Sequence, residues 1–286
     1  MEQLRSAWTN YPYCVTGVLT VPVAYVLFRK YCGSQKQPRI ECQPNTVLLH
    51  QMTRGPYAPS LSNFSVKLET YLRMAGIPYI NDLSGQFSPK GKTPFITYNG
   101  EDVSDTHFII EYLNKKLNIN LNKDLNQEQL AFAKAFQVLA DEYLYWILVY
   151  SRWVYDKNLT IIKMGLPGSP CLIWKLKKTM VRRVIGQGMG VHSAEEIKRI
   201  FLADLQALSD FLGNKQFLMG STPCEVDCSV FGLLSQFIWQ AVDDLCGNVI
   251  QEKFPALNEY CLRMRERFWP DWDDCITHGG TRPAIK

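Results

Sequence analysis

A proline at the start of a short apolar strand constrains the fold of this chain more than any other feature. The segment is 92–96, in which the chain enters the strand through Pro94, and an Asn99-Gly100 turn follows it. Asn-Gly is a strong signal for a two-residue turn between strands. Asp105 then stands just before an apolar periodic stretch, and such residues favour the start of a helix. The segment therefore predicts a hairpin followed by a helix over 106–117.

Length, charge and cysteine content limit the class of protein. The chain has 286 residues, of which 47% are hydrophobic and 20% charged, enough for about two globular domains. A net charge of +4, dispersed along the chain, and the lack of any zinc-finger or basic-zipper pattern exclude nucleic acid as an expected partner. Nine scattered cysteines do not form a disulfide framework, so we expect a reducing compartment.

The N-terminal residues predict a membrane anchor. No charged residue occurs from Ser6 to Phe28, and a spanning helix needs roughly 20 residues. A cleavable signal peptide would end in small residues, a mitochondrial presequence would be rich in arginine, and a buried helix would be unusual ahead of a complete domain. We expect a single-pass anchor at residues 1–32 and a polar linker at 33–45.

The charges around this stretch predict its orientation. Four basic residues follow it, whereas Arg5 and the amino terminus precede it; the four are Arg29, Lys30, Lys36 and Arg39. Positive residues favour the cytosolic side, so the body should face the cytosol.

The body divides into two parts. Residues 46–52 indicate a buried strand, 62–75 a helix and 77–80 a second strand, which with the hairpin and its helix give a thioredoxin-like α/β domain over 46–118. From Gln127 apolar residues recur only at helical spacing, which predicts an all-helical domain over 127–268 and a tail over 269–286.

Four segments carry a family resemblance: residues 67–79, 91–96, 105–113 and 225–228. With this order of elements the chain resembles the glutathione-transferase fold. It is most similar to the metaxin-like branch, which includes the failed axon connections proteins and the nematode cadmium-responsive proteins. The resemblance covers about residues 46–268.

The resemblance implies a glutathione site. In this fold the bond before Pro94 is expected to be cis, with the backbone of Thr93 facing a bound peptide. Asp105 and Thr106 would hold the γ-glutamyl end of glutathione, although Asp replaces the more usual Glu and Thr the usual Ser. The alternative is that Asp105 and Thr106 only cap their helix. Glutathione would be a ligand or co-substrate, and no other cofactor is expected.

The first helix bears on catalysis. Its start, Ser62 to Ser65, contains no cysteine, which excludes thiol–disulfide exchange there. Ser62, or the nearby Tyr57, would instead donate a hydrogen bond to the glutathione thiolate. The alternative for Ser62 is that it serves only as the N-cap of the helix.

Three other segments have two interpretations each. Residues 174–184 alternate basic and apolar side chains, which suits either an anionic membrane surface or a solvated helix with one buried stripe. Aromatic residues crowd 143–155, either as core or as the lining of an acceptor pocket. Cys224 and Cys228 lie one helical turn apart, but no second pair has metal-site spacing, so no metal site is expected.

Three functional hypotheses remain open. The first is a membrane-anchored metaxin-like protein that acts through an unidentified protein partner, in axonal development by resemblance to the failed axon connections proteins. The second is a membrane-tethered glutathione transferase that conjugates electrophiles. The third is a metal (cadmium) stress-response protein. The mitochondrial outer membrane is a candidate location, and a homodimer is left open.

Overall fold

The computed structural model describes residues 42–166, 168–241 and 245–286. Residues 42–286 belong to one compact unit. The expected anchor at residues 1–32 and most of the expected linker lie outside the described residues. Within those that are described, no helix combines the length and the apolar character needed to cross a membrane.

A four-stranded sheet forms the first part of the body, in the order β2-β1-β3-β4. Its strands are β1 (Val47–His50), β2 (Tyr79–Asp82), β3 (Phe95–Tyr98) and β4 (Glu101–Ser104). β1 pairs in parallel with β2 and antiparallel with β3, which pairs antiparallel with β4. The β3–β4 turn places Asn99 and Gly100 at φ values of 48° and 86°, as an Asn-Gly turn requires.

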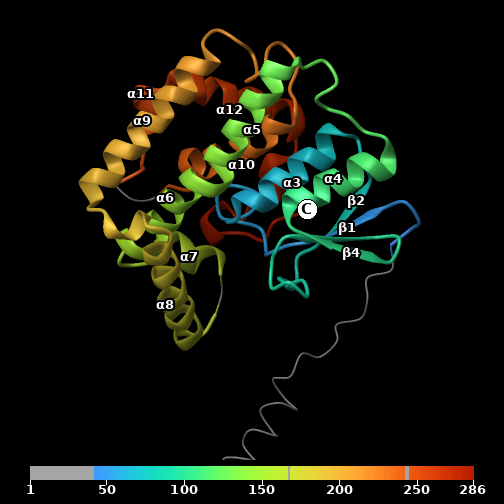
Figure 1. The fold of residues 1–286 in the computed structure, drawn as a ribbon. Helices are drawn as coiled ribbons and strands as arrows, with labels where there is room; N and C mark the ends of the chain where they lie inside the picture. Colours follow the sequence, from blue (N-terminus) through green and yellow to red (C-terminus); the bar gives the residue numbers. More distant parts are fainter. Residues whose placement is uncertain (1–41, 167, 242–244) are drawn as a thin grey trace, which may run out of the picture. The chain divides into compact units, whose positions relative to one another are not determined.

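Two helices cover one face of this sheet, as Figure 1 shows: α3 (Asn63–Met74) and α4 (Thr106–Leu117). Ser62 caps α3 and Asp105 caps α4 by accepting backbone N–H groups of Ser65 and His107. Apolar residues from both layers form one core, including Val47, Leu49, Leu68, Leu72, Ile96 and Ile109. The expected order, β-α-β followed by β-β-α, is therefore confirmed.

The rest of the described chain is helical. Its α-helices are α5 (Gln127–Val138), α6 (Tyr145–Tyr150), α7 (Thr160–Gly165), α8 (Pro170–Gln187), α9 (Ala194–Leu212), α10 (Glu225–Trp239), α11 (Val249–Lys253) and α12 (Pro255–Phe268). Two π-helical turns flank α6, namely η1 (Leu139–Leu144) and η2 (Ser151–Tyr155). Three short 3₁₀ turns are η3 (Met189–Val191), η4 (Trp272–Cys275) and η5 (His278–Gly280). The helical second part is as expected.

Helix α10 joins the two parts. It is buried on nearly all sides and packs along α3. Gly232 permits this close approach, because a Cβ added there would lie 2.7 Å from the carbonyl oxygen of Asn63 and 2.9 Å from the amide nitrogen of Lys67. The N-terminal half of α3 is thereby held against the helical domain.

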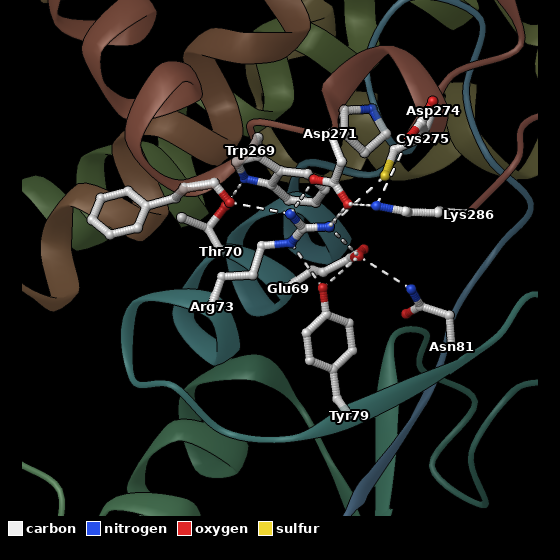
Figure 2. A network of polar contacts seen from close by, with 12 residues as sticks. Glu69, Thr70, Arg73, Tyr79, Asn81, Trp269, Asp271, Asp274, Cys275 and Lys286 are labelled. Atoms are coloured by element: carbon white, nitrogen blue, oxygen red, sulfur yellow. Dashed lines mark hydrogen bonds and ion pairs between the residues drawn. The ribbon is translucent and has the colours of Figure 1, made fainter.

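A buried carboxylate organises the polar contacts on the other side of α3 (Figure 2). Glu69 is 1% exposed and accepts hydrogen bonds from both terminal nitrogens of Arg54, at 2.8 and 3.0 Å. Tyr79 and Asn81 of β2 each donate to it at 3.1 Å. Burial alone would raise the pKa of Glu69, but the charge and hydrogen bonds of Arg54 outweigh it and lower the pKa below its usual value.

The same network holds the C-terminal tail. Arg73, one turn after Glu69, donates to Asp271 at 2.5 Å and stacks over the ring of Trp269, 3.9 Å from its centroid. Lys286 also donates to Asp271, at 3.2 Å. Burial tends to raise the pKa of Asp271, but the hydrogen bond from Arg73 lowers it to about 2. The tail is thus tied to the α/β domain.

Replacing Glu69 with glutamine is expected to destabilise the fold strongly, because the charge of Arg54 would stay buried without an anionic partner. The free energy of unfolding should fall by about 3–5 kcal/mol in urea denaturation. Glu259→Gln is the matched control, since Glu259 forms an exposed pair with Arg263 at 4.0 Å and should cost under about 1 kcal/mol. Equal losses in the two variants would contradict this account.

Candidate functional site

A cavity of about 630 Å³ lies between the α/β domain and the helical domain. Its wall comes from the start of α3, the segment before β3, the start of α4, and parts of α5, η1, α6, η2 and α8. The volume is in the range of small-molecule sites.

Four of the sequence-predicted residues meet in this cavity: Thr93, Pro94, Asp105 and Thr106 all line it. The Thr93–Pro94 peptide bond is cis, as the resemblance leads one to expect. The hydroxyl of Thr93 is buried and has no hydrogen-bond partner among the described residues. The structure therefore assembles the set that the resemblance implied for a peptide.

Asp105 already has a cation beside it. Its carboxylate accepts a hydrogen bond from the ammonium group of Lys92 and another from the backbone N–H of His107, at 3.2 Å. Partial burial works to raise the pKa of Asp105, but the hydrogen bonds from Lys92 and His107 outweigh it and lower the pKa. The carboxylate is therefore ionised at neutral pH. The side chain of Lys92 is 57% exposed and that of Asp105 26%.

The two hydroxyl candidates lie in different places. Ser62 lines the cavity, where its oxygen accepts the N–H of Ser65 at 3.3 Å and its own proton remains available to a ligand. Tyr57 is not among the lining residues. Its hydroxyl lies against Gly279 of the tail, where an added Cβ would be only 2.6 Å away.

Asp141 and Arg152, which we did not predict, also line the cavity. Asp141 of η1 accepts a hydrogen bond at 2.5 Å from Lys67 of α3, which is 1% exposed and is not a lining residue. The second oxygen of Asp141 has no hydrogen-bond partner among the described residues. Arg152 of η2 donates to the carbonyl of Leu61 at 2.7 Å. Asp141 and Arg152 both lie on π-helical turns, which are frequent at functional sites.

Part of the aromatic cluster reaches the same wall. Tyr145 and Trp153 line the cavity, whereas Trp146 does not. All three also belong to the helical core or pack against it, so the core interpretation holds for all three and the acceptor-pocket interpretation stays open for Tyr145 and Trp153. A single helical period assigned to the whole stretch could not separate them, because the two π turns shift the faces of the helix.

The paired cysteines have protein partners. Cys224 contacts the carboxylate of Asp227 at 3.4 Å and Cys228 contacts the sulfur of Met74 at 3.2 Å. Burial raises the pKa of both thiols. Across the described ranges no three His, Cys, Asp or Glu side chains gather as metal ligands would, so the metal-stress hypothesis gains no support from this part of the chain.

Comparison with known proteins places the fold. The glutathione S-transferase N-terminal domain model matches residues 63–158 and the C-terminal domain model matches residues 201–264. A solved glutathione transferase from Phanerochaete chrysosporium superposes with a TM-score of 0.54 at 17% identity, over 79% of this chain and 99% of that one. The chain thus has the glutathione-transferase fold.

Similar sequences indicate the family within this fold. Failed axon connections from Drosophila melanogaster is 34% identical over 82% of this chain, and the match spans 61% of that longer protein. "Isoprene-epoxide--glutathione S-transferase" from Rhodococcus is 35% identical, over 73% of this chain and 94% of the bacterial protein. Metaxin-2 from Mus musculus is 25% identical, over 80% of this chain and 91% of the mouse protein. The chain belongs to the metaxin-like family of glutathione-transferase fold that includes Failed axon connections.

The capping role of Ser62 can be tested against its neighbour. Ser62→Ala should lower the free energy of unfolding by about 1 kcal/mol, because α3 loses its N-cap. Ser65→Ala should be neutral or slightly stabilising, since the buried hydroxyl of Ser65 has no partner among the described residues. Urea denaturation of both variants measures the difference. A reversed order would show that Ser62 does not act as the cap.

Proposed function

We propose that this protein is a membrane-anchored, metaxin-like protein that acts by binding a protein partner, not by conjugating glutathione. The observation that carries this proposal is the contact between Lys92 and Asp105. In a transferase of this fold the carboxylate would hold the ammonium group of the γ-glutamyl end. Here the chain's own ammonium group is already there, so glutathione must displace it in order to bind.

The proposed organisation adds a tether to the folded body. Residues 1–32 would form the single-pass anchor, 33–45 the linker, 46–118 and 127–268 the two domains, and 269–286 the tail. The body would face the cytosol, and the mitochondrial outer membrane is one candidate membrane. The name of the fly relative supports an axonal setting for this chain.

A glutathione transferase is the second candidate, and two observations favour it. The cavity of about 630 Å³ contains Ser62 together with Thr93 and Thr106. The bacterial relative, whose name states a glutathione S-transferase, is matched over 94% of its length. Ser62 would donate its hydroxyl proton to the thiolate at the start of α3, where the helix dipole also favours an anion.

A glutathione titration of three proteins separates these functions. The unmodified protein should bind weakly, and Lys92→Ala should bind roughly 10-fold tighter because the charge-assisted hydrogen bond to Asp105 is freed. Asp105→Asn should bind no better than the unmodified protein. Calorimetry measures the affinities, and conjugation of a chlorodinitrobenzene electrophile should stay at background in all three.

Conjugation of glutathione above background would establish that the protein is a transferase. Turnover well above background that Ser62→Ala reduces by roughly 10²-fold would make Ser62 the thiolate donor and overturn the binding proposal. Tyr57→Phe is the matched control, because Tyr57 lies outside the cavity wall and should leave turnover unchanged.

The anchor has its own test. Deleting residues 1–31 should release a folded, helix-rich body from membranes. The body should fold because the two cores of the described residues lie within residues 47–276, and it should leave the membrane because the proposed anchor is gone. The full chain should stay with membranes through a high-salt wash, which screens charge attraction but leaves a spanning helix in place. A truncated body that still sediments with membranes after that wash would refute the anchor.

A further inference from the structure

Helix α8 contacts the body along one side only. Val184 is buried, and Ile173, Leu176 and Met180 are partly buried against the helical core at three- and four-residue spacing. The opposite side of the helix is exposed and includes Trp174, Lys175, Lys178, Arg182 and Ile185. We call these five residues the α8 surface. In Figure 1 α8 lies at the margin of the helical domain.

The charge of this region is of one sign. Between Lys157 and Ala194 the chain has seven basic residues and no acidic residue: Lys157, Lys163, Lys175, Lys177, Lys178, Arg182 and Arg183. Since the net charge of the chain is +4, the remaining residues together carry −3. None of the five basic side chains of α8 forms an ion pair with another described residue. The cations of α8 therefore have no direct acidic partner among the described residues.

Large apolar side chains are exposed beside these charges. Trp174 is 62% exposed and Ile185 50%, both on the α8 surface. Leu172 near the start of α8 is 51% exposed, and Val191 in the adjacent turn η3 is 69% exposed. Lys178 lies 5.2 Å from the ring centroid of Trp174. Single exposed apolar residues are ordinary, but several of them interleaved with unpaired cations on one face suggest a binding surface.

We propose that the α8 surface binds the headgroup layer of an anionic phospholipid bilayer. The three cations of this surface complement lipid phosphates and carboxylates, and each Lys or Arg at such a surface adds to the attraction. Trp174 and Ile185 of the same surface would enter the boundary between headgroups and acyl chains, where aromatic rings are favoured. A nucleic-acid backbone offers the charge but no apolar layer for these side chains, so the bilayer fits better.

This surface is independent of the proposed anchor. It belongs to the described body and involves no residue before Lys157, so failure of the anchor proposal would leave it standing. The two attachments also differ in their response to salt. A spanning helix resists salt, whereas attraction through Lys175, Lys178 and Arg182 weakens as the ionic strength rises.

The test uses the chain without residues 1–31, which retains the compact unit over residues 42–286, and vesicles of phosphatidylcholine with about a third phosphatidylserine. We expect this chain to sediment with these vesicles at low salt and to dissociate from them at high salt. It should not bind vesicles of pure phosphatidylcholine. The triple change Lys175→Gln, Lys178→Gln and Arg182→Gln should lower the partition coefficient roughly 100-fold. A second variant, Trp174→Ser with Ile185→Ser, should bind more weakly while keeping every charge.

The matched control removes the same number of charges from another exposed place, with Lys115→Gln, Lys116→Gln and Lys123→Gln. It should bind nearly as well as the parent chain. Equal losses in the two triple variants, or unchanged binding in the α8 triple variant, would overturn the proposal. Binding to a DNA duplex as tight as to the vesicles, and unaffected by the Trp174 and Ile185 changes, would assign the surface to nucleic acid instead. Circular dichroism confirms that each variant is folded.

Discussion

The buried carboxylate of Glu69 is the interaction on which the placement of α3 against the sheet and the C-terminal tail depends. It lies in the middle of α3 and receives donors from Arg54 in the loop after β1 and from Tyr79 in β2. One turn later Arg73 extends the same network to Asp271 of the tail. A charge at this depth is tolerated only when it is paired and hydrogen-bonded. The network therefore gives α3 one position between the sheet and α10, and the cavity opens at the start of that helix.

The cavity shows how one fold can serve different functions. The residues that the resemblance implied for a peptide line it, with a cis bond before Pro94 and a helix cap at Asp105. Lys92 changes the electrostatics of the cavity, because its ammonium group donates to the carboxylate of Asp105. Asp141, which accepts a hydrogen bond from the buried Lys67, adds a carboxylate to the wall. A shared fold can provide a similar cavity without the same reaction. The reaction depends on whether the side chains of the cavity are free to bind a ligand.

Charge is distributed unevenly along the chain, and this would affect how the body orients at an anionic surface. The segment from residue 157 to 194 is uniformly basic, whereas the remainder is slightly acidic. An orienting field of this kind would turn α8 toward an anionic surface and the acidic remainder away from it. A tethered body would meet such a surface at high effective concentration, so even a weak interfacial contact would orient it.

Local signals in the sequence determined the elements and the family. The Asn99-Gly100 turn, the caps at Ser62 and Asp105 and the position of Pro94 act over a few residues, so the hairpin, α3 and α4 could be predicted. Only the tertiary structure decided which of the candidate site residues lie together at the cavity.

The tertiary structure placed Ser62 at the cavity but Tyr57 against the tail, because the chain turns between them. It brought Asp141 to Lys67, 74 residues away, through a π turn that no regular period reveals. It joined Arg73 to Asp271 across 198 residues. Contacts of this range arise from how layers pack, and packing is a property of the whole chain.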